Sequence, residues 1–214
     1  MADQISFKTR IKDEAILYSQ YYYSYYVMND YLLISDAFVN SPYYIIRAEK
    51  NNYLHLLGVS TPLPATSFFD KCLNGTLEED DLIISHHGQD SPASKGSIRR
   101  KIKTIPYIMN LFSHPCMVEE DFRKNSIRCS LASSNTKCTL GFISTPYARP
   151  QTLLKGNELD SSKAKPVKIV LQKSRINSKF NSLVWGNTDD LIHYYETIKN
   201  LICDELNSFI ISHL

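Results

Sequence analysis

The hydrophobic period of this chain changes at the dipeptide His114-Pro115, and this change constrains the fold more than any other feature. Before it, apolar residues recur at helical spacing, most clearly over residues 12–28, which carry an aromatic face, and over residues 97–112. After it, four short segments have the alternation or the β-branched content of strands: residues 116–118, 127–132, 138–144 and 167–173. The chain therefore combines helices and strands in separate blocks.

Segregated blocks of this kind predict an α+β fold with N-terminal helices packed on an antiparallel meander sheet and a long C-terminal helix. The 214 residues are enough for one large domain, predicted over residues 1–214. It would comprise an N-terminal helical extension (1–42), a core (43–185) and a closing helix (187–214). Residues 31–37 fit either a strand or a continuation of the first helix.

The composition gives no sign of a membrane segment or a metal site. Apolar runs are shorter than the roughly twenty residues of a membrane span, and the N-terminus lacks the layout of a signal peptide. We therefore expect a cytoplasmic protein. The five cysteines are scattered, and the adjacent His86 and His87 would point to opposite sides of an extended segment. No metal ligand set and no cofactor are expected.

Charge is distributed unevenly, although the formal net charge is only +2. Residues 95–103 contain five cations and no acid, and residues 123–179 contain twelve lysines or arginines against two acids. Such segregation predicts a basic face, which is the electrostatic footprint of a protein that binds a polyanion. The alternative is that these charges are solvated and have no ligand.

His55 is the first catalytic candidate, because it stands alone in an apolar run over residues 51–58, which is predicted to be a short helix with Gly58 as its C-cap. Histidine is the side chain that most readily exchanges a proton near neutral pH. The alternative is a core histidine hydrogen-bonded to backbone.

Several segments together resemble a known family. They are residues 48–58 (AEKNNYLHLLG), 64–72 (PATSFFDKC), 140–142 (LGF), 150–154 (PQTLL) and 167–173 (VKIVLQK). In this order they resemble the phage-associated barnase/EndoU/colicin/RelE-like (BECR-fold) nuclease family of bacteriophages, plasmids and integrated bacterial elements. The similarity spans roughly residues 43–185, and its most specific part is Asn-x-x-His-Leu-x-Gly, which begins at Asn52.

The resemblance implies a metal-independent endoribonuclease, often used as a toxin against tRNA or other RNA. Cleavage by the ribose 2′-hydroxyl needs a base, an acid and cations that stabilise charge on phosphorus. The partners implied are RNA, with tRNA as a candidate, and a neutralising antitoxin or a host defence protein. The oligomeric state stays open.

Site residues follow from the resemblance and from the charge pattern. The catalytic candidates are His55 as acid or base, with Arg149, Thr152 and Lys173 around the scissile phosphate. The RNA-binding candidates are Lys50, Asn52, Lys155, Arg99, Arg100 and Lys103. Each also has a structural explanation: Asn52 fits a helix cap, Thr152 fits a turn and Lys173 fits an exposed strand end.

The chain also departs from the expected pattern, because no second histidine or glutamate is placed as a partner of His55. A lysine or arginine would have to share the work. The rival hypothesis is a catalytically inactive relative that binds RNA, or binds a host defence protein as a counter-defence inhibitor. A third hypothesis is a structural or interaction module, in which the tyrosine-rich first helix and the acidic last helix mediate assembly.

Overall fold

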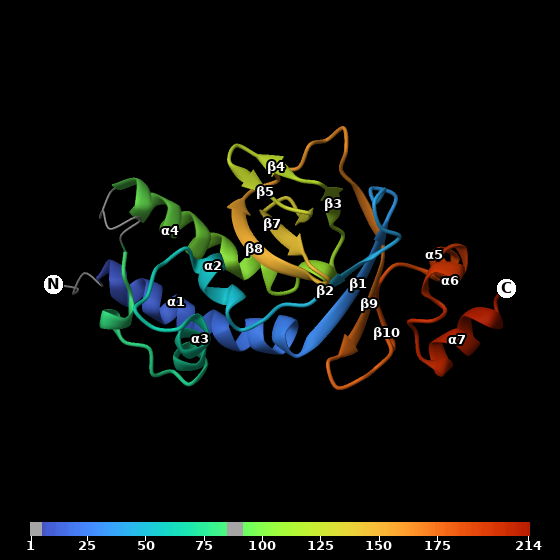
Figure 1. Ribbon diagram of the computed structural model, residues 1–214, viewed down its shortest axis with the longest axis horizontal. Coiled ribbons are helices and arrows are strands. Elements are labelled where there is room, and N and C mark those ends of the chain that lie inside the picture. Colours follow the sequence, from blue (N-terminus) through green and yellow to red (C-terminus); the bar gives the residue numbers. More distant parts are fainter. Residues whose placement is uncertain (1–5, 85–91) are drawn as a thin grey trace.

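A mixed β-sheet that closes into a barrel forms the centre of the protein (Figure 1). The computed structural model describes residues 6–84 and 92–214, so His86 and His87 lie outside the described residues. Within the described chain, seven strands close the barrel in the order β1-β2-β8-β7-β6-β3-β9, and β9 pairs back to β1. The strands are β1 (Asn29–Ser35), β2 (Tyr44–Ile46), β3 (Met117–Glu120), β6 (Leu131–Ser134), β7 (Cys138–Ser144), β8 (Ala148–Lys155) and β9 (Lys165–Ser174). Strand β10 (Ser182–Trp185) pairs with β9, and β4 (Arg123–Lys124) pairs with β5 (Ile127–Arg128) in a separate hairpin.

The predicted antiparallel meander is therefore wrong. Strands β3, β6, β7 and β8 do pair antiparallel in turn, but β2 joins β8 in parallel, with Ile46 opposite Ala148. The barrel closes because β1 pairs along β9, from Asn29 opposite Ser174 to Ser35 opposite Val167. Local alternation reveals strands and hairpins, whereas pairing between such distant segments leaves no periodic signal. Six of the seven β1 residues are buried, so β1 also lacks the alternation that would distinguish it from a helix.

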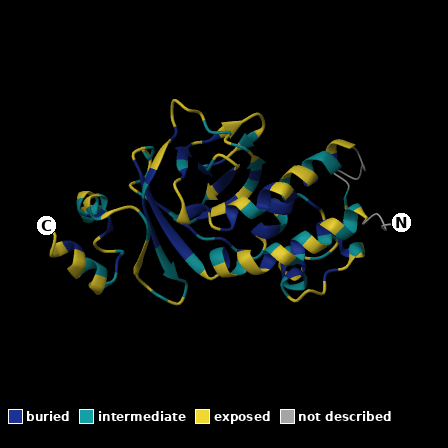
Figure 2. Cartoon of the chain, turned by 180° about the vertical axis from the view of Figure 1, so that it is seen from behind, coloured by how far each residue is buried: buried dark blue, intermediate teal, exposed yellow. Residues whose placement is uncertain are grey.

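Helices cover one side of the barrel (Figure 1). They are α1 (Phe7–Tyr22), which continues as the π-helical turn η1 (Tyr23–Val27), then α2 (Asn52–Leu57), α3 (Ala65–Leu73) and α4 (Pro92–Thr104). Short 3₁₀ turns η2 (Glu79–Asp81), η3 (Ile105–Ile108) and η4 (Leu111–Ser113) complete this half. Buried aromatic rings join the helices: Tyr22 lies 5.0 Å from Tyr53, and Tyr53 lies 5.2 Å from Phe69, between ring centroids. Figure 2 shows the resulting pattern, with buried residues in the barrel and exposed residues on the outer sides of the helices.

The predicted long C-terminal helix is also wrong. Residues 187–214, all of them described, form three short helices: α5 (Thr188–His193), α6 (Tyr195–Ile198) and α7 (Asp204–Ile211). The break before α7 has a backbone cause. Phe180 N–H donates to the Leu201 carbonyl at 2.8 Å, and Cys203 N–H donates to the Phe180 carbonyl at 2.9 Å. These bonds hold Ile202 and Cys203 in an extended conformation, although the apolar spacing of the segment fits the predicted helix.

A second apolar cluster lies between these short helices and the barrel. Leu32 and Ile34 of β1 and Ile169 and Leu171 of β9 pack there against buried residues of the C-terminal segment, among them Leu191, Ile198, Ile202 and Ile210. The main cluster, which includes Leu33 and Val170, lies on the other face of the same strands. Both faces of the β1–β9 pair are thus covered. Among the described helices, none combines the length and the apolar content of a membrane span.

Candidate functional site

A cleft of about 220 Å³ lies between α2, α4 and β8, and we call it the His55 cleft. His55 and Gly58 contribute to it from α2 and its end, Ser97 and Lys101 from α4, and Gln151 from β8. It therefore joins the motif that carried the family resemblance to the basic run of residues 95–103.

Helix α2 presents His55 to solvent because its apolar residues face the other way. Tyr53, Leu56 and Leu57 are fully buried, whereas His55 is exposed. The structure thus removes the alternative of a core histidine. Gly58 ends the helix in the left-handed region at φ +71° and donates its N–H to the Leu54 carbonyl.

Asn52 has a structural role at the start of α2. Its side-chain oxygen accepts a 2.7 Å hydrogen bond from the Glu49 N–H, and the residue is buried. This bond ties the first residue of α2 to the turn before the helix and is not a helix cap, because the N-cap residue is Asn51 and no side-chain capping hydrogen bond is present there.

Lys101 is the partner that sequence reasoning missed. Its Nζ donates a 2.6 Å hydrogen bond to the backbone carbonyl oxygen of His55, and burial lowers the pKa of its amine to about 8. A Cβ on Gly58 would lie 2.6 Å from Lys101 Cδ, so the glycine also makes room for this side chain. In the sequence Lys101 was only one of five cations, because nothing local indicates that α4 lies against α2.

Gln151 enters the cleft because of a β-bulge. The β7–β8 register passes from Phe142 opposite Pro150 to Gly141 opposite Thr152, which leaves Gln151 as the extra residue. Thr152 packs near Cys129 instead. Gly141 has no Cβ, and the point where one would lie is 2.9 Å from Thr152 Cγ2 and 2.6 Å from Cys129 Sγ, so both side chains lie over this glycine. Thr152 is therefore a packing residue outside the His55 cleft.

The other two predicted phosphate ligands, Arg149 and Lys173, are not among the residues that line the His55 cleft. Arg149 is an exposed residue of β8 opposite Ile143, and it does not line the cleft. Lys173 lies on β9, where its Nζ donates to the carbonyls of Asn177 and Ser178 at 2.9 and 3.2 Å. None of the three residues predicted to surround the phosphate together with His55 lines the His55 cleft.

Lys173 belongs instead to a group of charges around Asp30, a fully buried residue of β1. Arg47 holds the Asp30 carboxylate through two hydrogen bonds, one of them 2.9 Å from Nε to Oδ1. Arg175 Nε lies 3.5 Å and Lys173 Nζ 3.8 Å from the same carboxylate. The Arg47 guanidinium also stacks on the Tyr147 ring, 3.7 Å from its centroid. These contacts tie β1 and β9 to the segment after β2.

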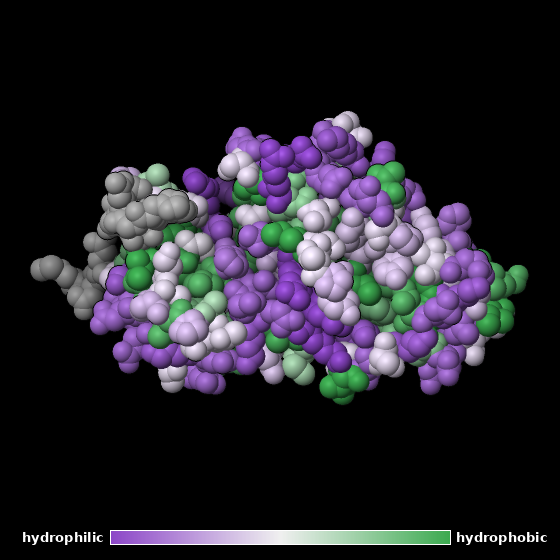
Figure 3. Space-filling model, viewed as in Figure 1, coloured by the Kyte–Doolittle hydropathy of each residue, from purple (hydrophilic) through white to green (hydrophobic). Residues whose placement is uncertain are grey.

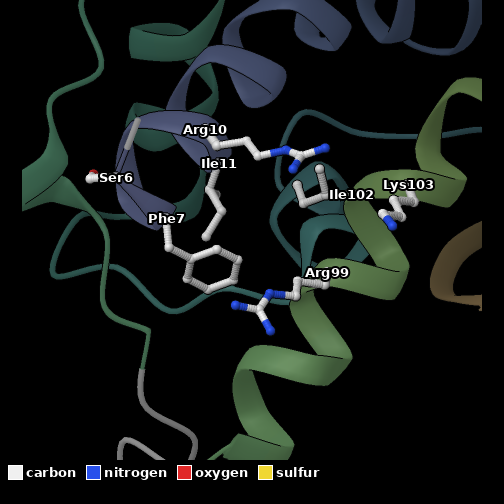
Figure 4. A pocket seen from close by; sticks show the side chains of 7 residues that line it. All are labelled: Ser6, Phe7, Arg10, Ile11, Arg99, Ile102 and Lys103. Atoms are coloured by element: carbon white, nitrogen blue, oxygen red, sulfur yellow. The ribbon is translucent and has the colours of Figure 1, made fainter. Parts of the chain in front are cut away.

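The remaining RNA-binding candidates lie at separate places on the surface. Lys50 forms a 2.8 Å ion pair with Asp70, whereas Lys155 is exposed at the end of β8 and Arg100 is exposed on α4. Figure 3 shows that hydrophilic side chains form a band across the middle of one face, between more apolar areas. Arg99 and Lys103 line a second cleft, between α1 and α4, together with Arg10, which the sequence did not single out (Figure 4).

Among the described residues, no three His, Cys, Asp or Glu side chains gather as a metal ligand set.

Comparison with known proteins gives one match. A family model described as phage-Barnase-EndoU-ColicinE5/D-RelE like nuclease 4 matches residues 10–180 and thus most of the chain. No curated protein and no solved structure matches. The family match confirms the resemblance inferred from the sequence motifs.

Proposed function

This chain belongs to the phage-Barnase-EndoU-ColicinE5/D-RelE like nuclease 4 family, and we propose that it is an endoribonuclease that cleaves RNA in the His55 cleft without a metal ion. The observation that carries the proposal is the meeting of His55 and Lys101 in one cleft, from two different helices. A nuclease that uses the ribose 2′-hydroxyl needs one group that accepts a proton and one that supplies positive charge and a proton.

The proposed reaction is a transesterification. The imidazole of His55 takes the proton of the 2′-hydroxyl, and the 2′-oxygen forms a bond to phosphorus. The bond from phosphorus to the 5′-oxygen breaks, and the leaving oxygen takes a proton from the Lys101 ammonium group. The products are a 2′,3′-cyclic phosphate and a 5′-hydroxyl end.

Burial fits Lys101 for this role. An amine with a pKa of about 8 is still protonated at neutral pH but gives up its proton more readily than an ordinary surface lysine. Its charge also faces a partly closed cleft, in which it stabilises a phosphorane more than it would in open water. The Gln151 amide is available to donate a hydrogen bond to a phosphate oxygen.

The proposal predicts RNA as the substrate and DNA as a non-substrate, because the nucleophile is the 2′-hydroxyl. The proposed substrate is bacterial RNA, including tRNA, so the proposed site of action is the cytoplasm. An unneutralised enzyme of this kind would be toxic to the cell that makes it, which agrees with an antitoxin as partner.

The test is incubation of the purified protein with total bacterial RNA in EDTA. Wild type is expected to cleave, and His55→Ala is expected to lose activity by a factor of about 10²–10⁴. Because His55 is exposed, this variant should keep its circular dichroism spectrum and its melting temperature. His114→Ala is the matched control, since His114 is also exposed and lies outside the cleft.

Two results would contradict the proposal: no cleavage by wild type, or full cleavage by His55→Ala. Salt-sensitive RNA binding without cleavage would support the rival hypothesis of an inactive RNA-binding relative. Capture of a host defence protein together with weak RNA affinity would support a counter-defence inhibitor.

A further inference from the structure

The cleft between α1 and α4 has a volume of about 640 Å³ and is lined by Arg10, Arg99 and Lys103 (Figure 4). We propose that this cleft binds the phosphate backbone of single-stranded RNA, as a subsite separate from the His55 cleft. The inference rests on the proposed function for the identity of the nucleic acid. It adds a binding site that the catalytic argument does not require.

The three cations surround an apolar floor formed by buried residues of α1 and α4. Arg99 and Lys103 are four residues apart on α4 and so share one face of that helix. Ile11 of α1 and Ile102 of α4 are 1% and 5% exposed, and both line the cleft. Figure 4 shows Arg10 reaching from α1 toward α4 above them. Packing of the two helices therefore places three cationic side chains around one cleft.

The three charges have no acidic partner among the described residues. Arg99 instead lies over the Phe7 ring, 4.9 Å from its centroid. By contrast, Lys50 and Lys71 on the same helical half are paired with Asp70 and Asp81, at 2.8 and 2.7 Å. Like charges around one cleft without an acidic partner repel one another, and a bound anion would relieve that repulsion.

An RNA strand fits this arrangement better than a single small anion. The cations come from two helices and line an open cleft, so one phosphate group would meet only part of them. Successive phosphates of a strand would meet them in turn. The Phe7 ring adds a surface on which a base or an arginine can stack.

Helix α4 lies between the two clefts and connects them. Lys101 and Ser97 line the His55 cleft, whereas Arg99 and Lys103 line the other flank of the same helix. A helix with its side chains is about 10–12 Å across, so a strand that crosses α4 can occupy both clefts. The subsite should therefore strengthen binding of longer RNA and leave the chemical step unchanged.

The experiment measures binding of a fluorescein-labelled single-stranded RNA by anisotropy at several salt concentrations, in the non-cleaving His55→Ala background. The test variant carries Arg10→Gln, Arg99→Gln and Lys103→Gln. The matched control carries Arg123→Gln, Arg128→Gln and Lys163→Gln, which removes the same charge from exposed residues elsewhere. A third variant, Arg10→Lys, Arg99→Lys and Lys103→Arg, keeps the charge and should restore binding if the fold is intact.

We expect the test variant to bind at least about tenfold more weakly, with a log–log salt slope shallower by about 2, since each phosphate contact on a single strand contributes about 0.7. The matched control should retain nearly full affinity. Equal losses in both triple variants, or no loss in the test variant, would overturn the inference.

The outcomes for the two proposals are separable. If wild type cleaves RNA but the test variant binds normally, the subsite is wrong and the proposed function stands. If wild type does not cleave but the test variant loses affinity selectively, the subsite stands and the enzyme proposal fails. Inorganic phosphate that displaces the RNA at equal ionic strength would indicate a small-anion site and overturn the strand-binding inference.

Discussion

Lys101 Nζ donates its 2.6 Å hydrogen bond to the backbone carbonyl of His55, and thereby joins α4 to α2 at the residue proposed to be the base. Helix α2 has only six residues, too few to be stable alone, so contacts with the rest of the fold must hold it in place. The same bond places the amine beside the histidine. One packing contact thus fixes where the amine lies relative to His55, and burial of the same side chain lowers the pKa of the amine.

Deprotonation of Lys101 should cause the fall in cleavage rate on the alkaline side of the pH–rate profile. Because burial lowers the pKa of this amine to about 8, the ammonium form is lost as the pH rises through that value. Cleavage by wild type should therefore decline above about pH 8. Lys101→Arg keeps the charge to far higher pH and should remove that decline, whatever its overall rate. An unchanged alkaline limb in this variant would exclude Lys101 as the acid.

Gly58→Ala should reduce cleavage more than it reduces stability. Alanine at φ +71° costs about 1–2 kcal/mol, and its Cβ would also displace the Lys101 side chain. A displacement on this scale should lower kcat about tenfold or more. Gly75→Ala is the control, since Gly75 has φ +70° but a Cβ there meets nothing within 4 Å. Equal activity in the two variants, measured after equal loss of stability, would contradict the predicted contact.

Asp30 should be essential for the fold. Asp30→Ala would leave Arg47, Lys173 and Arg175 without their shared carboxylate and should cost about 3–5 kcal/mol in the free energy of unfolding. Asp70→Ala breaks an exposed pair with Lys50 and should cost at most about 1 kcal/mol. Urea denaturation of both variants measures the difference. Similar costs would mean that the Asp30 group is far better solvated than its burial indicates.

Gln151 and Thr152 should differ in function although they are neighbours. Gln151→Ala removes a hydrogen-bonding group from the His55 cleft and should lower kcat/KM several-fold. Thr152→Val keeps the shape that packs near Cys129 and removes only the hydroxyl, so activity should stay close to wild type. The reverse result would show that the bulge lies one residue away from its observed place.

Local sequence signals account for part of this structure. The alternation over residues 138–144 and 167–173 predicted β7 and most of β9, and Gly58 correctly marked the end of a short helix bearing His55. These features depend on neighbours in the chain, which a sequence displays directly.

The rest depends on contacts between distant segments. Pairing of β1 with β9 closes the barrel, and the backbone bonds of Phe180 interrupt the C-terminal stripe that otherwise resembles one helix. The residues that line the His55 cleft could not be predicted from the sequence for the same reason. Lys101 reaches His55 only because α4 packs beside α2, and the bulge that turns Gln151 rather than Thr152 into the cleft is a feature of strand register.

The most direct test of the central claim is chemical analysis of the RNA ends produced by wild type in EDTA. Attack by the ribose 2′-hydroxyl in the His55 cleft predicts fragments with 2′,3′-cyclic phosphate and 5′-hydroxyl ends, which His55→Ala and Lys101→Ala do not produce. Fragments with 3′-hydroxyl and 5′-phosphate ends, or cleavage that appears only when a divalent metal is restored, would contradict the account.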